Sequence, residues 1–262
     1  MKTTNNMITK ILYQKRWMVF WWFIAFAGTA AVTLAFFPAF KGTNIGQVFN
    51  SLPVSVQKIV GDASSYSNIN GYIGQEIFGL RAPLIVIILS IATFNSLMVS
   101  EERKGILETH ISLPLSRSKI LTSKLIAGII IITISSLGLF IGTNIVLYFI
   151  HEHYSQIKLL ELVLSSTLLG ITFGLITVFL NSIFGVRSIV LGISCAYAFF
   201  SYLITSFALS IHSLHIIEKL SLFHFYIFTN SFHFHNLLAF IYVSAGLIII
   251  SYLFFNRRDI AT

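Results

Sequence analysis

Residues 101–117 read EERKGILETHISLPLSR, a polar stretch between long apolar runs. The region around it carries eight formal charges, those of Glu101, Glu102, Arg103, Lys104, Glu108, Arg117, Lys119 and Lys124. One charge at the centre of a bilayer costs about 3 kcal/mol, so burying them all in lipid would cost on the order of 20 kcal/mol. We therefore expect this stretch to lie in water, between two segments that cross a membrane.

The composition is typical of a membrane protein with several spans. Of the 262 residues, 56% are hydrophobic and 10% are charged, whereas about 25% of a soluble chain is charged. The net charge of +8 does not indicate nucleic-acid binding, because the basic residues cluster at the ends of apolar runs. Cys195 is the only cysteine, which excludes a disulfide framework and a paired-cysteine metal site.

Six charge-free runs are long enough to cross about 30 Å of hydrocarbon as helices of about 20 residues. They cover residues 17–40, 82–100, 125–150, 162–186, 188–217 and 220–256. The last two exceed one span, which predicts an outer loop at 210–235 with a short or re-entrant helix. The sequence thus predicts an all-α, polytopic membrane protein with six transmembrane helices in a single domain, residues 1–262.

The distribution of basic residues predicts the orientation. With both termini in the cytoplasm, twelve Lys and Arg residues lie inside and five lie outside, as the positive-inside rule favours. The inner set is Lys2, Lys10, Lys15, Arg16, Arg103, Lys104, Arg117, Lys119, Lys124, Arg187, Arg257 and Arg258, and the outer set is Lys41, Lys58, Arg81, Lys158 and Lys219.

Two further segments flank the first predicted span. Residues 5–16 place Met7, Ile8, Ile11 and Leu12 at helical spacing among basic residues, which predicts an amphipathic helix along the inner membrane surface. The alternative is an extension of the first span into water. Residues 38–81 form the largest expected non-membrane piece, an outer loop too small for an independent domain.

The third and fourth predicted spans each carry glycines four residues apart. These are Gly138 with Gly142, and Gly170 with Gly174. Such a pair leaves a groove that lets another helix approach closely. We expect both pairs to pack against helices, either within one chain or across a dimer.

The polar stretch itself predicts a short amphipathic helix. On a helix over residues 105–113, Ile106, Leu107, His110, Ile111 and Leu113 fall within an arc of about 160°, and Pro114 ends the helix. The acidic residues argue against simple adhesion to an anionic membrane surface. A helix that docks in a protein groove fits better than one that rests on lipid headgroups.

The same stretch resembles the first cytoplasmic loop of type-2 ATP-binding-cassette (ABC) permeases, whose pattern is E-E-x-x-G-T-L-E-x-x-L-x-x-P-[VL]-S-R. The matching positions are Glu101, Glu102, Gly105, Leu107, Glu108, Pro114, Ser116 and Arg117. Ile106 replaces the common threonine, and Ile111 with Leu113 replaces a leucine pair. KLSLFHFY at 219–226 is similar to the family's L-S-P-F-H-Y-Y, and FFNRRDI at 254–260 is similar to its closing F-x-R-R-D.

This resemblance implies a cytoplasmic coupling helix that seats in a cleft of an ABC ATPase subunit. The implied coupling interface comprises Glu101, Glu102, Gly105, Ile106, Leu107, Glu108, Ile111, Pro114 and Arg117, in a coupling loop at 101–119. The chain has no G-x-x-x-x-G-K-[ST] phosphate loop, so we expect no cofactor and no enzymatic activity here, with ATP and Mg on the partner. Family members pair, so a second permease copy or a paralogue is also implied.

The resemblance further implies an exporter in a bacterial cytoplasmic membrane, in contact with its lipids. No Asp, Glu, Lys or Arg lies deep in a predicted span, and there are 25 phenylalanines. We therefore expect amphipathic or hydrophobic cargo, such as antimicrobial peptides, lipids or drugs. The family includes exporters of phenol-soluble modulins and bacteriocin immunity systems.

Other classes of protein fit the sequence less well. An ion-coupled secondary transporter usually carries ionisable groups at mid-membrane. No such group lies deep in a predicted span of this chain, and the polar residues Asn95, Asn144 and Asn181 lie toward span ends. A non-transporting membrane subunit is a further alternative. No metal site is expected, because the histidines at 151/153, 212/215 and 233/235 are typical of a membrane interface. Ile106 and Cys195 each break a membrane-protease motif, E-E-x-x-x-R and G-x-S-G respectively.

Overall fold

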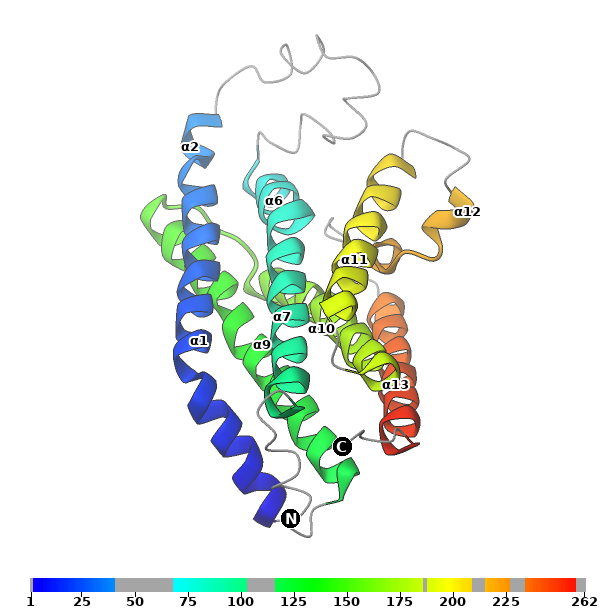
Figure 1. The fold of residues 1–262 in the computed structure, drawn as a ribbon. Helices are drawn as coiled ribbons and strands as arrows, with labels where there is room; N and C mark the ends of the chain where they lie inside the picture. The colour runs from blue at the N-terminus through cyan, green and yellow to red at the C-terminus, as the bar shows by residue number, and fades with distance from the viewer. Residues whose placement is uncertain are drawn as a thin grey trace.

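A computed structural model describes residues 2–40, 68–102, 116–185, 188–208, 215–226 and 234–257. These ranges are helical and contain no strand (Figure 1). The elements are α1 (Lys2–Ala35), α2 (Phe37–Phe40), α6 (Ile69–Tyr72), the π-helix η1 (Ile73–Arg81), α7 (Ala82–Glu102), α9 (Arg117–Phe149), α10 (Gln156–Phe184), α11 (Ser188–Ala208), α12 (His215–Glu218), the 3-10 helix η3 (Leu222–Phe225) and α13 (Phe234–Arg257).

The predicted number of spans is confirmed in the described part of the chain. Six helical segments there are long and apolar enough to cross a membrane: Met7–Ala39, Ile69–Val99, Arg117–Phe149, Gln156–Phe184, Ser188–Ala208 and Asn236–Arg257. The start of α1 and the end of α13 lie at one end of the bundle, which we call the terminal end (Figure 1). The opposite end, where α6, α12 and η3 lie, is the distal end.

The second span begins earlier than the sequence predicts. The sequence assigns residues 69–81 to an outer loop at 38–81, before the charge-free run that begins at Ala82, but α6, η1 and α7 form one continuous helical path. The two charges form an ion pair with each other, and Arg81 Nη1 also donates to the Glu76 carbonyl at 2.7 Å. Because the charges pair on one face of the helix, the helix extends past them.

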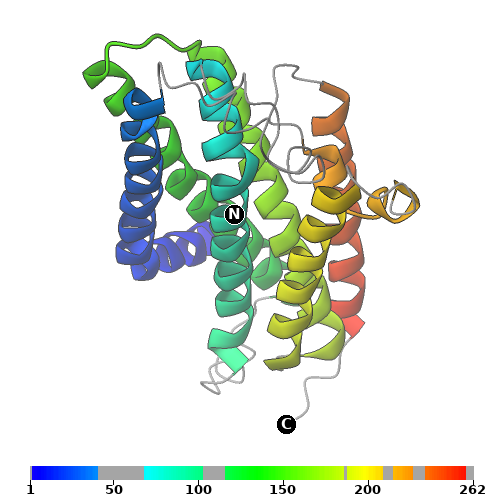
Figure 2. The ribbon, with the colours of Figure 1, turned by 90° about the horizontal axis from the view of Figure 1, so that it is seen from above.

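The centre of the bundle is α10. It lies between α7 and α9 on one side and α11 and α13 on the other, while α1 lies along α9 at the edge (Figures 1 and 2). Within the most apolar part of each span, the share that is buried in the protein is 78% for α10, but only 22% for α1, 22% for α11 and 11% for α13. The last three helices therefore present most of their apolar surface outward, where a bilayer would cover it.

Both glycine pairs pack against helices of the same chain. A methyl group added at Gly138 would meet the carbonyl oxygen of Phe23, and one at Gly142 would meet the carbonyl oxygen of Ala27, both on α1. On α10, a methyl at Gly170 would meet the Val86 side chain of α7. At Gly174 the methyl would meet the side chains of Ser90 and Phe94 on α7.

The α1–α9 and α7–α10 glycine contacts differ in how easily the facing atoms can move aside. The α1–α9 contact sets backbone against backbone, which cannot move aside without shifting a helix. In the α7–α10 contact the nearest atoms belong to side chains, although Gly170 also lies close to the Val86 carbonyl. We infer that α1 and α9 hold together as a rigid pair, and that the seam between α7 and α10 is the more adaptable one.

Gly142→Ala is expected to lower the thermal unfolding midpoint in detergent by several degrees. The added methyl overpacks the α1–α9 contact, which costs about 1–3 kcal/mol. The matched control is Gly28→Ala on α1, where nothing lies within 4 Å of the new methyl. That control should leave the midpoint unchanged or raise it, since alanine favours the helix. Equal midpoints for both variants would contradict the close-packing account.

Candidate functional site

The predicted coupling loop lies between the ends of two spans. Glu101 and Glu102 are the last residues of α7, and Arg117 is the first residue of α9. Ser116 has extended backbone (φ −67°, ψ 143°), and its carbonyl accepts the Lys119 amide at 2.9 Å, as at the start of a helix. Gly105, Ile106, Leu107, Glu108, Ile111 and Pro114 lie outside the described residues, and so does the predicted coupling helix.

The beginning of α1 docks at this same end of the bundle. Ile11 is buried with Leu97 of α7 and Ala127 of α9, and the apolar residues Met7, Ile8 and Leu12 pack around them. Lys15 Nζ donates to Ser96 Oγ of α7 at 2.8 Å. The apolar face that the sequence assigns to the membrane surface thus contacts protein on both flanks of the loop. These residues continue into the first span without a break, although α1 bends along its length (Figures 1 and 2).

The end of α13 is tied to the start of α9 by two side-chain contacts. Ser118 Oγ lies 3.1 Å from Asn256 Nδ2, and one turn further Thr122 Oγ1 lies 2.6 Å from the Tyr252 hydroxyl. The two helices run in opposite directions. Four residues forward on α9 therefore correspond to four residues back on α13, and the two contacts lie one helical turn apart. The sequence gives only an indirect sign of these contacts, namely two pairs of polar residues, each four apart, near the ends of apolar runs.

Lys124 departs from its predicted position in water. It lies two turns into α9 and is only 3% exposed. Lys124 is therefore inside the protein, near the terminal end.

Deeper in the bundle, the contacts between helices are made by uncharged polar groups. Asn181 Nδ2 of α10 donates to Asn95 Oδ1 of α7 at 3.4 Å. Thr167 Oγ1 of α10 donates to Ser136 Oγ of α9 at 2.8 Å, and Thr172 Oγ1 lies 3.0 Å from Ser244 Oγ of α13. The central helix α10 is thus hydrogen-bonded to α7, α9 and α13. Asn144 instead donates to the Phe140 carbonyl of its own helix.

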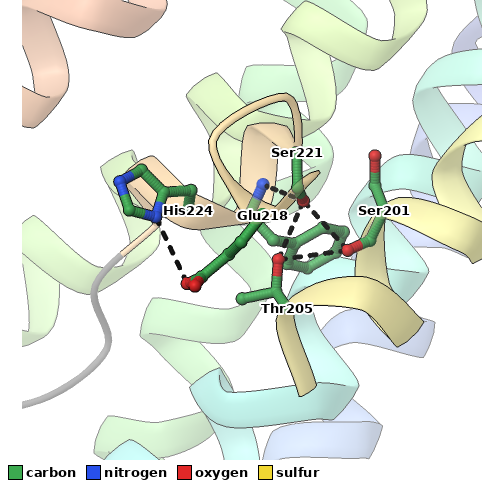
Figure 3. Close-up of polar contacts among 6 residues, drawn as sticks. Ser201, Thr205, Glu218, Ser221 and His224 are labelled. Atoms are coloured by element: carbon green, nitrogen blue, oxygen red, sulfur yellow. Dashed lines mark hydrogen bonds and ion pairs between the residues drawn. The ribbon is translucent and has the colours of Figure 1, made fainter. Parts of the chain in front are cut away.

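At the distal end, the KLSLFHFY motif forms η3 and its flanks. Ser221 Oγ accepts the Phe223 amide at 3.2 Å, as a helix cap does, and donates to the Ser201 carbonyl of α11 at 2.9 Å (Figure 3). Thr205 of α11 donates to Ser221 Oγ at 2.8 Å. His224 pairs with Glu218 of α12 at 3.2 Å. The motif is therefore fixed to α11 by hydroxyl groups.

Six helices long and apolar enough to cross a membrane, packed in one bundle, are the architecture of a multi-pass membrane protein. The sequence profile of the ABC-2 family transporter protein matches residues 7–260, nearly the whole chain. The chain belongs to this family of ABC permeases. No curated protein matches the chain in a sequence search.

The contact between Thr122 and Tyr252 is expected to show a measurable coupling energy. Thr122→Val and Tyr252→Phe each remove one hydroxyl, and in a double-mutant cycle they should interact by about 0.6 kcal/mol, a typical value for hydrogen bonds inside membranes. Unfolding in mixed micelles measures the four free energies. Thr122→Val combined with Tyr197→Phe, at the distal side of α11, should be additive. If the effects of Thr122→Val and Tyr252→Phe on the unfolding free energy were also additive, the contact between the two side chains would contribute nothing to stability.

Proposed function

We propose that this subunit is the membrane half of an ATP-driven exporter and that residues 101–117 receive the movement of a separate cytoplasmic ABC ATPase. The observation that carries the proposal is the family match over residues 7–260, combined with a charged loop between α7 and α9. In this proposal the terminal end of the bundle, with both chain termini, faces the cytoplasm. ATP and Mg bind to the partner, because the sequence has no phosphate loop.

The contacts around the loop support a route for the movement. A force applied between Glu102 and Arg117 acts on α7 and on α9 together. The α9 helix is locked to α1 by Gly138 and Gly142, so these two helices move as one body. The nearest α7 atoms to the α10 glycines belong to side chains, so in this proposal α7 is the helix that shifts against the centre of the bundle. The start of α1 also packs against Leu97 of α7, so it would move with the same displacement.

The transporter is proposed to work as a dimer with a second copy of the chain or with a paralogue. The outward apolar faces of α1, α11 and α13 leave room for both a second subunit and lipid. The cargo is proposed to be amphipathic or hydrophobic, such as antimicrobial peptides, phenol-soluble modulins, lipids or drugs. In the described spans, the contacts of α10 with α7, α9 and α13 are made by uncharged groups, which suits cargo of this kind.

A secondary transporter driven by an ion gradient is the second candidate, and a subunit without transport activity is a third. Buried Lys124 is the observation that favours the ion-coupled candidate, because ionisable groups inside a membrane protein often serve ion coupling. Its place near the terminal end, away from mid-membrane, argues for the ATP-driven candidate. Collapse of the proton gradient without ATP depletion separates the two, since it stops only the ion-coupled transporter.

Glu102→Lys and Glu108→Lys are each expected to abolish the stimulated ATPase activity of the complex co-purified with its ATPase. Reversing a charge in the coupling loop repels the partner groups that accept it. Insertion into the membrane should be unchanged, because both positions lie outside the apolar runs. The matched control is the charge reversal Lys158→Glu, at an exposed position on the distal side, which should leave stimulation intact. Full stimulation in both loop variants would refute the coupling role.

A further inference from the structure

Two exposed basic residues flank the contact between the start of α9 and the end of α13. Ser118 of α9 is hydrogen-bonded to Asn256 of α13, and the next residue on each helix is basic and exposed: Lys119 on α9 and Arg257 on α13. In the described part of the chain, no carboxylate pairs with either basic side chain. Two cations are therefore held close together by a contact that fixes the two helices to each other.

Both basic residues lie on the same side of that contact. Successive residues of a right-handed helix are turned by about 100°. Because α9 and α13 run in opposite directions and face each other, one step past the contacting pair turns both side chains to the same side. This side is the outer surface of the bundle, since Lys119 and Arg257 are exposed, whereas Leu121 and Phe255 on the opposite side are buried.

An apolar surface continues from the two cations toward the distal end. Ile126 lies two turns beyond Lys119 on the same face of α9 and is exposed. On α13, Leu253 and Ile250 lie one and two turns before Arg257, and both are exposed. The axial distance from Lys119 to Ile126 is about 10 Å. One headgroup layer of a bilayer is about 5–8 Å thick, so this surface reaches from the headgroups to the acyl chains.

The lengths of the two helices place the cations at headgroup level. With 33 residues α9 is about 50 Å long, and with 24 residues α13 is about 36 Å long. Both exceed the hydrocarbon thickness of about 30 Å, so their ends emerge into the headgroup layers. Lys119 is the third residue of α9 and Arg257 is the last residue of α13.

We propose that Lys119 and Arg257 form a binding site for an anionic phospholipid at the terminal end of the bundle. The lipid phosphate lies between the two cations, and the acyl chains lie along Ile126 and Leu253. Basic pockets between membrane helices bind anionic headgroups in this way. A zwitterionic headgroup carries its own cation and gains less from the site. Because the lipid bridges α9 and α13, it reinforces the contact between them.

The exposed apolar surface decides between a lipid and a soluble acidic protein as the occupant. An acidic protein would complement the two charges but would leave Ile126 and Leu253 uncovered. A phospholipid satisfies both parts of the surface with one molecule, since its charge and its acyl chains are separated by the same depth. The site faces outward from the bundle, so the bound lipid is a structural component of the protein.

The test titrates the delipidated full chain in neutral detergent with phosphatidylglycerol or phosphatidylcholine, and native mass spectrometry measures the fraction of lipid-bound chain. The parent should bind phosphatidylglycerol about thirtyfold more tightly than phosphatidylcholine. Lys119→Gln and Arg257→Gln should each weaken phosphatidylglycerol binding about fivefold, and the double variant about thirtyfold. The matched control is Lys10→Gln with Lys158→Gln, which removes two exposed charges elsewhere and should bind as the parent does.

Equal affinity of the parent for both lipids would overturn the site, and so would an equal loss in the control double variant. Glycerol phosphate, which lacks acyl chains, should not compete with the lipid. Competition at equal concentration would mean that charge alone is bound, as for a soluble acidic partner. If the double variant failed to fold, the two single variants would decide.

The lipid site and the proposed function can fail separately. Lipid binding requires neither ATPase nor cargo, so a negative titration would leave the ATP-driven exporter standing. Absence of ATP-dependent transport in the parent chain would refute the exporter, while the titration would still measure the site.

Discussion

The bundle depends on the close approach of α1 and α9 at Gly138 and Gly142. There the backbone of one helix lies against the backbone of the other, and no side chain of either glycine intervenes. In lipid, apolar side chains gain little by leaving the solvent, so van der Waals contact between closely fitted helices stabilises the fold. The remaining helices assemble around this pair and around α10, whose hydroxyl and amide groups find partners on three neighbours.

This distribution of contacts has a mechanical consequence. A helix pair in backbone contact cannot slide without losing its fit, whereas a glycine facing side chains tolerates rotamer changes. The aqueous loop joins one helix of each kind, since α9 belongs to the rigid pair and α7 faces the adaptable seam. In the proposed mechanism, displacement of the loop would move α7, which continues into the π-helix η1 at the opposite end.

Polar groups act at both ends of this path, and for different reasons. At the terminal end, Lys15 connects α1 to α7 and Asn256 connects α13 to α9, near water, where a hydrogen bond is replaceable and each contact contributes little. At the distal end, the Phe78 carbonyl and the Tyr226 hydroxyl meet in an apolar interior, where an unmade bond is costly. The buried bond fixes the second span to the segment before the last span, while the exposed ones set the alignment of the helices.

The sequence by itself determined the six spans and the family, because transfer of charge into lipid is costly enough to read from composition and because the motifs are local. It also indicated the glycine pairs, but which helix each pair meets is decided by packing between distant residues. The start of the second span was misplaced, since pairing of Glu76 with Arg81 is invisible in a charge count. Only the tertiary structure decided that Ile11 faces protein and that Tyr226 reaches Phe78, because an apolar or hydroxyl side chain carries no local sign of the neighbour it will find.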